Sequence, residues 1–145
     1  MFDLDSVAID HKVASGGKWV EFMNGRFLVA RWNNRKAENL RNELHMEFYS
    51  ELSKLGEGKM PDDLEDKFAT IQARIMAETV LLGWENVGQK GKELEFSPET
   101  ALKVLSNPAY VDLYQFIQNE SIKRENFVAQ STEKVVKDVK LSADS

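Results

Sequence analysis

Imidazole rings are the side chains of this sequence that could bind a transition metal or transfer a proton at neutral pH. There are two, His11 and His45, which stand far apart and are surrounded by no HExxH or comparable ligand spacing. A zinc site needs several ligands at a characteristic spacing, so the sequence predicts no metal. His45 follows an apolar residue in a helical pattern, and we expect it to be a partly buried, hydrogen-bonded structural residue.

Carboxylates could hold a cation or do acid–base chemistry, and three of them, Glu43, Glu47 and Glu51, recur at four-residue steps. Like charges at this spacing usually mark a solvent-exposed helix face, and the Glu and His pairs of helical dimetal sites are missing. The chain has no cysteine, no GxSxG sequence and no glycine pattern of the GxGxxG or Walker type. We therefore predict no cofactor and no enzymatic activity.

The composition limits the class of protein. The 145 residues fit one domain, and 42% hydrophobic with 30% charged residues is ordinary for a globular protein. A net charge of −5 argues against a general nucleic-acid-binding protein, which needs a concentrated basic surface. No segment approaches the roughly 20 consecutive apolar residues that span a bilayer. Neither nucleic acid nor membrane is therefore expected as a partner.

Apolar periodicity and turn residues indicate the elements that would position a binding site. Apolar residues at spacings of three and four predict helices, and Asn24-Gly25 between two apolar runs predicts a β-hairpin with a type I′ turn. The predicted fold is α+β, predominantly helical, with the hairpin packed on about four helices. The predicted boundaries are a flexible arm at 1–17, a single domain at 18–129 with the hairpin at 18–32 and helices at 35–55, 61–82, 98–106 and 109–127, and a polar tail at 130–145. The first two long helices should be antiparallel neighbours, because their link is short.

Both faces of the predicted hairpin carry apolar residues. Pairing across the turn places them in two sets, with Val20, Phe22, Phe27 and Val29 on one face and Trp19, Met23, Leu28 and Ala30 on the other. A two-stranded hairpin is not stable alone in water. We expect one face to pack on the helices and the other to meet another chain or a third strand.

The stretch from Leu81 to Leu105 contains the strongest boundary signals. Gly83 could end the preceding helix, and 93–96 alternates polar and apolar residues as a short strand does. Ser97 followed by Pro98 predicts a helix start. Serine can accept a hydrogen bond from the amides of the first turn, and proline at the first helical position loses no hydrogen bond, because the N–H group there has no partner within the helix. Trp84 adjoins apolar residues and is expected in the core.

The order of these sequence motifs resembles that in the tail assembly chaperones of long-tailed bacteriophages (siphophages). The matching motifs are Trp84-Glu85-Asn86-Val87, the apolar pair Leu94 and Phe96, Ser97-Pro98-Glu99, the leucine pair Leu102 and Leu105, and the amino-terminal hairpin with Trp19-Val20-Glu21 and 26–31. The resemblance covers roughly Gly17 to Phe127.

The resemblance implies a chaperone in the host cytoplasm that binds the tape measure protein, keeps it soluble while the tail tube assembles around it, and is absent from the mature virion. A homo-oligomer is expected. A longer form made by frameshifting, common in this family, would add the tail tube protein as a partner. Two alternatives stay open: a tail or head-tail component retained in the particle, and a small DNA-binding domain that uses the first two helices.

Apolar residues outside the expected core are the candidates for partner binding. Trp19 and Leu28 share a hairpin face, and valines near the carboxyl terminus fall close to helical spacing but are too few and too β-branched to hold an isolated helix. The segment from Val128 would then be an arm that orders on binding. The predicted contact residues are Trp19, Leu28, Val128, Val135, Val136 and Val139.

Overall fold

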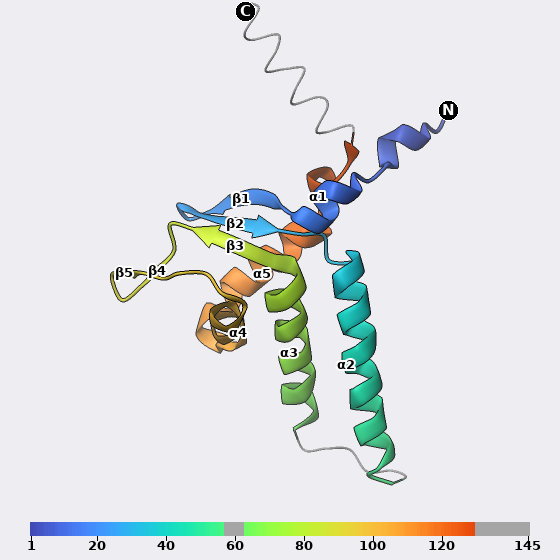
Figure 1. Ribbon diagram of the computed structural model, residues 1–145, viewed down its shortest axis with the longest axis vertical. Helices are drawn as coiled ribbons and strands as arrows, with labels where there is room; N and C mark the ends of the chain where they lie inside the picture. Colours follow the sequence, from blue (N-terminus) through green and yellow to red (C-terminus); the bar gives the residue numbers. More distant parts are fainter. Residues whose placement is uncertain (57–62, 130–145) are drawn as a thin grey trace, which may run out of the picture.

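The computed structural model describes residues 1–56 and 63–129. A three-stranded antiparallel sheet lies at one end, α5 (Val111–Ile122) and α4 (Pro98–Ser106) pack below it, and two long helices run away from it (Figure 1). The protein is therefore an α+β protein in which helices predominate, as the sequence predicts.

The hairpin consists of β1 (Lys18–Phe22) and β2 (Gly25–Val29). Its turn lies one residue earlier than predicted: Met23 and Asn24 have the two positive φ angles, 49° and 73°, and Phe22 pairs with Gly25. This changes the register by two residues. Because side chains alternate with a period of two, the predicted faces of the strands are retained.

A third strand, β3 (Leu81–Glu85), pairs antiparallel with β2, so β2 is the central strand. Leu81 and Leu82 were predicted to lie in a helix ended by Gly83, and this prediction was wrong. The helix α3 (Leu64–Ile75) instead continues as a π-helical segment, Met76–Val80, and the chain then becomes extended. The strand joins the free edge of β2, where its backbone groups gain partners.

The inner face of the sheet forms the main core with α4 and α5. The ring of Phe22 stacks on Phe116 with centroids 4.4 Å apart, and Phe27 meets the same ring edge to face at 6.3 Å. Several side chains of this core are almost wholly buried: Phe27, Val29, Ala77, Val80, Leu81, Ala101 and Ile117. The inner hairpin face therefore packs on helices, as expected.

The two long helices, α2 (Arg35–Ser53) and α3, lie side by side and project together from the body (Figure 1). Leu44 and Ile75 form a second buried cluster between them. The predicted antiparallel arrangement is confirmed. The N-cap position of α3 is Asp63.

Asn34 fixes the start of α2 to the end of the π-helical segment, a role that was not predicted from the sequence. Its Oδ1 accepts a hydrogen bond from the amide of Ala37 at 3.0 Å, while its Nδ2 donates to the carbonyl oxygens of Arg31 and Thr79 at 2.7 and 2.9 Å. Both the oxygen and the nitrogen of this buried side-chain amide therefore have hydrogen-bond partners.

Replacing Asn34 should show how much this amide contributes. We expect Asn34→Ala to lower the free energy of unfolding by about 2–4 kcal/mol, because the cap is lost and two carbonyl groups lose their donor. Asn34→Asp keeps the cap acceptor but removes the donor, and it should also destabilise. Urea unfolding would measure both; an Asn34→Asp variant as stable as the parent would show that the two Nδ2 bonds contribute nothing.

Residues 1–17 differ from the flexible arm that was predicted. They contain a 3-10 turn, Leu4–Val7, and a short helix α1 (His11–Gly16) whose N-terminus is capped by the side chain of Asp10. The Asp10 amide donates to the carbonyl of Phe127 at 2.8 Å, and Ile9 pairs with Val128 in an antiparallel bridge. The amino-terminal segment thus has partners at the far end of the described chain, which local sequence patterns cannot reveal.

The predicted strand at 93–96 is replaced by a smaller hairpin of β4 (Gly88–Gln89) and β5 (Lys92–Glu93). Lys90 and Gly91 make its turn with φ angles of 54° and 77°. The helix start at Ser97 is confirmed, because its Oγ accepts a hydrogen bond from the Thr100 amide at 3.0 Å and Pro98 opens α4.

Candidate partner-binding surfaces

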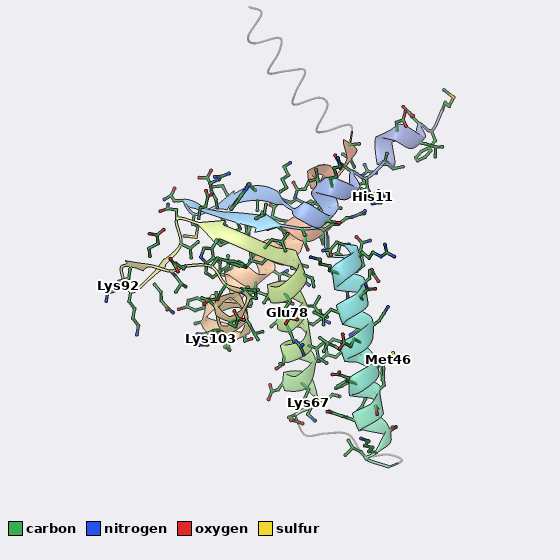
Figure 2. The ribbon with its side chains drawn as sticks, in the orientation of Figure 1. His11, Met46, Lys67, Glu78, Lys92 and Lys103 are labelled. Carbon is green, nitrogen blue, oxygen red and sulfur yellow. The ribbon has the colours of Figure 1, made fainter. Side chains whose placement is uncertain are left out.

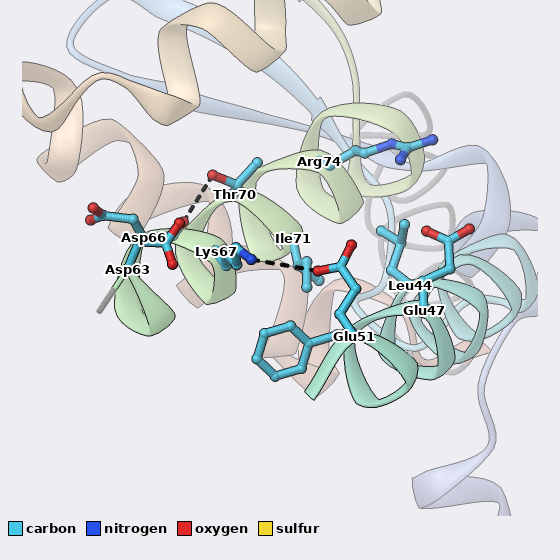
Figure 3. A pocket seen from close by; sticks show the side chains of 10 residues that line it. Leu44, Glu47, Glu51, Asp63, Asp66, Lys67, Thr70, Ile71 and Arg74 are labelled. Carbon is cyan, nitrogen blue, oxygen red and sulfur yellow. Dashed lines mark hydrogen bonds and ion pairs between the residues drawn. The ribbon is translucent and has the colours of Figure 1, made fainter. Parts of the chain in front are cut away.

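A groove lies between α2 and α3 on the part that projects from the body (Figure 3). Its volume is about 430 Å³, and its apolar floor is formed by Leu44, Phe48 and Ile71. Thr70 and six ionisable residues surround that floor: Glu47 and Glu51 on α2, Asp66, Lys67 and Arg74 on α3, and Asp63 at the α3 cap. The groove therefore combines an apolar floor with a charged rim.

The groove continues toward the tip of the helices as a second hollow of about 250 Å³. The two hollows share Phe48, Glu51 and Lys67, and the second one adds Leu52, Lys54 and Leu55. An ion pair between the Lys67 Nζ and the Glu51 Oε2, 3.5 Å long, lies where they join (Figure 3). Together the two hollows make one elongated depression, which we call the α2–α3 groove.

Large apolar side chains outside the groove are also exposed on these helices. Tyr49 and Phe68 are 64% and 46% exposed, and Met46 is 74% exposed on the side of α2 that faces away from α3 (Figure 2). His45 stacks near Phe68 with ring centroids 6.1 Å apart. His45 is partly buried, as predicted, but its Nε2 has no hydrogen-bond partner among the described residues.

The outer face of the sheet carries two of the predicted contact residues. Trp19 and Leu28 are direct cross-strand neighbours, and Trp19 is 37% exposed. The Arg26 guanidinium lies 4.8 Å from the Trp19 ring centroid and pairs with Glu85 on β3 at 2.6 Å. Arg26 thus covers part of the indole, and the rest of the Trp19 side chain is exposed.

The carboxy-terminal contact residues are only partly within the described chain. Val128 is buried beside Phe127, and the amide of the next residue, Ala129, donates to the carbonyl of Ala8 at 3.0 Å. Val128 is therefore a core residue in this structure, not an exposed contact. Three further valines predicted to bind the partner lie outside the described residues: Val135, Val136 and Val139.

Glu120 is a buried carboxylate, and its contacts decide whether it is a reactive acid. Its Oε1 accepts from Lys123 at 2.7 Å, and Asn126 donates to its Oε2 at 2.8 Å and to its carbonyl at 2.9 Å. Desolvation raises the pKa of Glu120, but the hydrogen bonds from Lys123 and Asn126 with the Lys123 charge lower it more, so this pKa lies below the ordinary value. Glu120 is an ionised structural residue that holds the end of α5.

The Glu120 contacts should make stability depend on pH in acid. Because the folded-state pKa is depressed, their contribution is fully present above the unfolded-state pKa of about 4.3 and is lost as pH falls through the lower folded-state value. We expect Glu120→Gln to melt lower than the parent protein at pH 7 and the difference to shrink in acid. Melting curves from neutral to acidic pH test this, with the exposed Glu95→Gln as control; a pH-independent difference would contradict it.

Two properties of the described residues concern metal binding and membranes. The described ranges contain no group of three or more histidine, aspartate or glutamate residues placed to hold a metal ion. No helix in the same ranges is long and apolar enough to cross a bilayer.

Comparison with known proteins places the chain in a family. A family model described as "YdaY prophage protein" matches residues 31–138. The chain belongs to this family. It is therefore a phage-derived protein. The match includes every residue of the α2–α3 groove but neither Trp19 nor Leu28, and no curated protein and no solved structure matches the chain.

Proposed function

We propose that this YdaY-family protein is a tail assembly chaperone that binds the tape measure protein and keeps it soluble while the tail tube assembles. The observation that carries the proposal is the projecting helix pair, because it leaves an apolar groove and large apolar side chains exposed. Contiguous exposed apolar surface with a polar rim is typical of protein–protein interaction sites, and a groove between helices suits a helical partner.

Two other observations support a role in phage assembly. Family membership gives a phage origin. The order of the sequence motifs from Trp84 to Leu105 resembles that in tail assembly chaperones. Two residues of this stretch have structural roles, since Trp84 is buried and Ser97 caps α4. A chaperone of this kind acts in the host cytoplasm, needs no cofactor and performs no chemical step.

The main alternative is a tail or head-tail component that stays in the particle. Mass spectrometry of purified particles and of the infected or induced cell lysate would separate the two. The chaperone proposal predicts abundant protein in the lysate during assembly and none at structural stoichiometry in particles. A stoichiometric amount in mature particles would overturn it in favour of the structural component.

A further inference from the structure

The α2–α3 groove has the length and shape of a site for a helix. Its apolar floor follows Leu44, Phe48 and Leu52, which are one turn apart on α2, so the floor is about 12 Å long, a little over two helical turns. An amphipathic helix presents apolar anchors at the same spacing. A third helix laid in the groove would cover the seam that the two-helix projection leaves open, as in a three-helix bundle.

The charges of the rim indicate the chemistry of that helix. The lining residues of the two hollows include four carboxylates and three cations, and one of the cations, Lys54, lies at the carboxyl end of α2. The other two cations already have acidic neighbours, since Lys67 pairs with Glu51 at 3.5 Å and Arg74 with Glu78 at 3.2 Å. The carboxylates left without an ion pair within 1–56 and 63–129 are Glu47, Asp63 and Asp66. An incoming helix with basic flanks would therefore meet complementary charge on both sides.

We propose that the α2–α3 groove binds an amphipathic helix whose apolar stripe is flanked by lysine or arginine. This rests on the proposed function only for the identity of the partner, which would be a segment of the tape measure protein. The Lys67–Glu51 pair crosses the middle of the groove, and both side chains are substantially exposed. Such a pair contributes little stability, so a partner cation can replace Lys67 beside Glu51 at small cost.

A synthetic peptide tests the recognition chemistry without the tape measure protein. The probe is a labelled helix of leucine, alanine and lysine with leucines at i, i+4 and i+7, and its comparison peptide has glutamate in place of every lysine. Fluorescence anisotropy should show saturable binding of the lysine peptide and at least tenfold weaker binding of the glutamate peptide. Amide NMR shifts should change in α2 and α3. Changes confined to other elements would overturn the proposal.

Two matched double variants separate groove recognition from attraction to an acidic protein. Glu47→Lys with Asp66→Lys reverses two rim charges, and Glu43→Lys with Glu65→Lys makes the same charge change on the same helices outside the groove. The rim variant should bind the lysine peptide about tenfold more weakly than the control variant. Equal affinities would overturn the proposal. Tighter binding by a chain ending at Ala129 would also overturn it, since the carboxy-terminal segment would then be the occupant.

The same variants distinguish failure of this inference from failure of the proposed function. If the parent protein captures the tape measure protein and the rim variant captures it equally well, the groove is not the binding site and the chaperone function stands. If the parent captures no tape measure protein but binds the lysine peptide in the groove, the recognition chemistry stands and the partner is a different basic helix.

Discussion

Trp84→Ala should lower the free energy of unfolding by about 3–5 kcal/mol, a large part of the stability of a domain of this size. Trp84 is only 8% exposed, its ring meets Phe96 edge to face at 5.0 Å, and its Nε1 donates to the Leu94 carbonyl at 2.7 Å. The substitution therefore leaves a cavity and removes the donor that ties the loop before α4 to β3. Urea unfolding followed by far-ultraviolet circular dichroism measures the effect.

Two companion substitutions calibrate that result. Trp84→Phe keeps an aromatic ring but loses the hydrogen bond to Leu94, so we expect a cost of about 1–2 kcal/mol from the bond. Ser97→Ala removes the cap of α4 and should cost about 1 kcal/mol. If Trp84→Ala left the unfolding curve unchanged and abolished partner binding, Trp84 would be a contact residue, not a core residue.

Shortening the chain from its carboxyl end should have a sharp threshold between Ala129 and Asn126. A chain ending at Ala129 keeps Phe127, which is 1% exposed, and the bridge between Ile9 and Val128. We expect its melting temperature to match that of the full chain. A chain ending at Asn126 loses a buried aromatic ring and the partners of the amino-terminal segment, and it should melt at least about 10 °C lower.

The same pair of chains tests the predicted carboxy-terminal arm. If 130–145 orders on binding, the chain ending at Ala129 should lose partner affinity or self-association while keeping its melting temperature. Differential scanning calorimetry and light scattering give the two readouts. Unfolding of the chain ending at Ala129 would place 130–145 in the core, and unchanged partner capture and oligomer size would make it a tail without a binding role.

Features governed by nearby residues could be predicted from the sequence. The caps and starts of helices depend on side chains within one turn, which is why Ser97 and Pro98 marked α4 correctly. Apolar residues at spacings of three and four predicted α2, where Leu44 and Phe48 are buried, because this period places them on one helix face. The even period of strands preserved the faces of the hairpin although its turn was misplaced.

Features governed by distant pairing could not be predicted. An apolar run such as Leu81-Leu82 is compatible with a buried helix end or a strand. It forms the strand β3 because it pairs with the free edge of β2, which is distant in the sequence. The structure of the amino-terminal segment depends on contacts with Phe127 and Val128 at the other end of the described chain. The groove likewise requires both helices to project beyond the body (Figure 1), and no local sequence pattern specifies that arrangement.

Co-expression with the tape measure protein of the same phage tests the central claim most directly. The quantities to measure are the soluble fraction of the tape measure protein and its recovery with the tagged chain in a pull-down, with the Glu47→Lys and Asp66→Lys double variant alongside. The chaperone function predicts a soluble complex that co-purifies with the parent protein. A tape measure protein that stays insoluble and never co-purifies would contradict it.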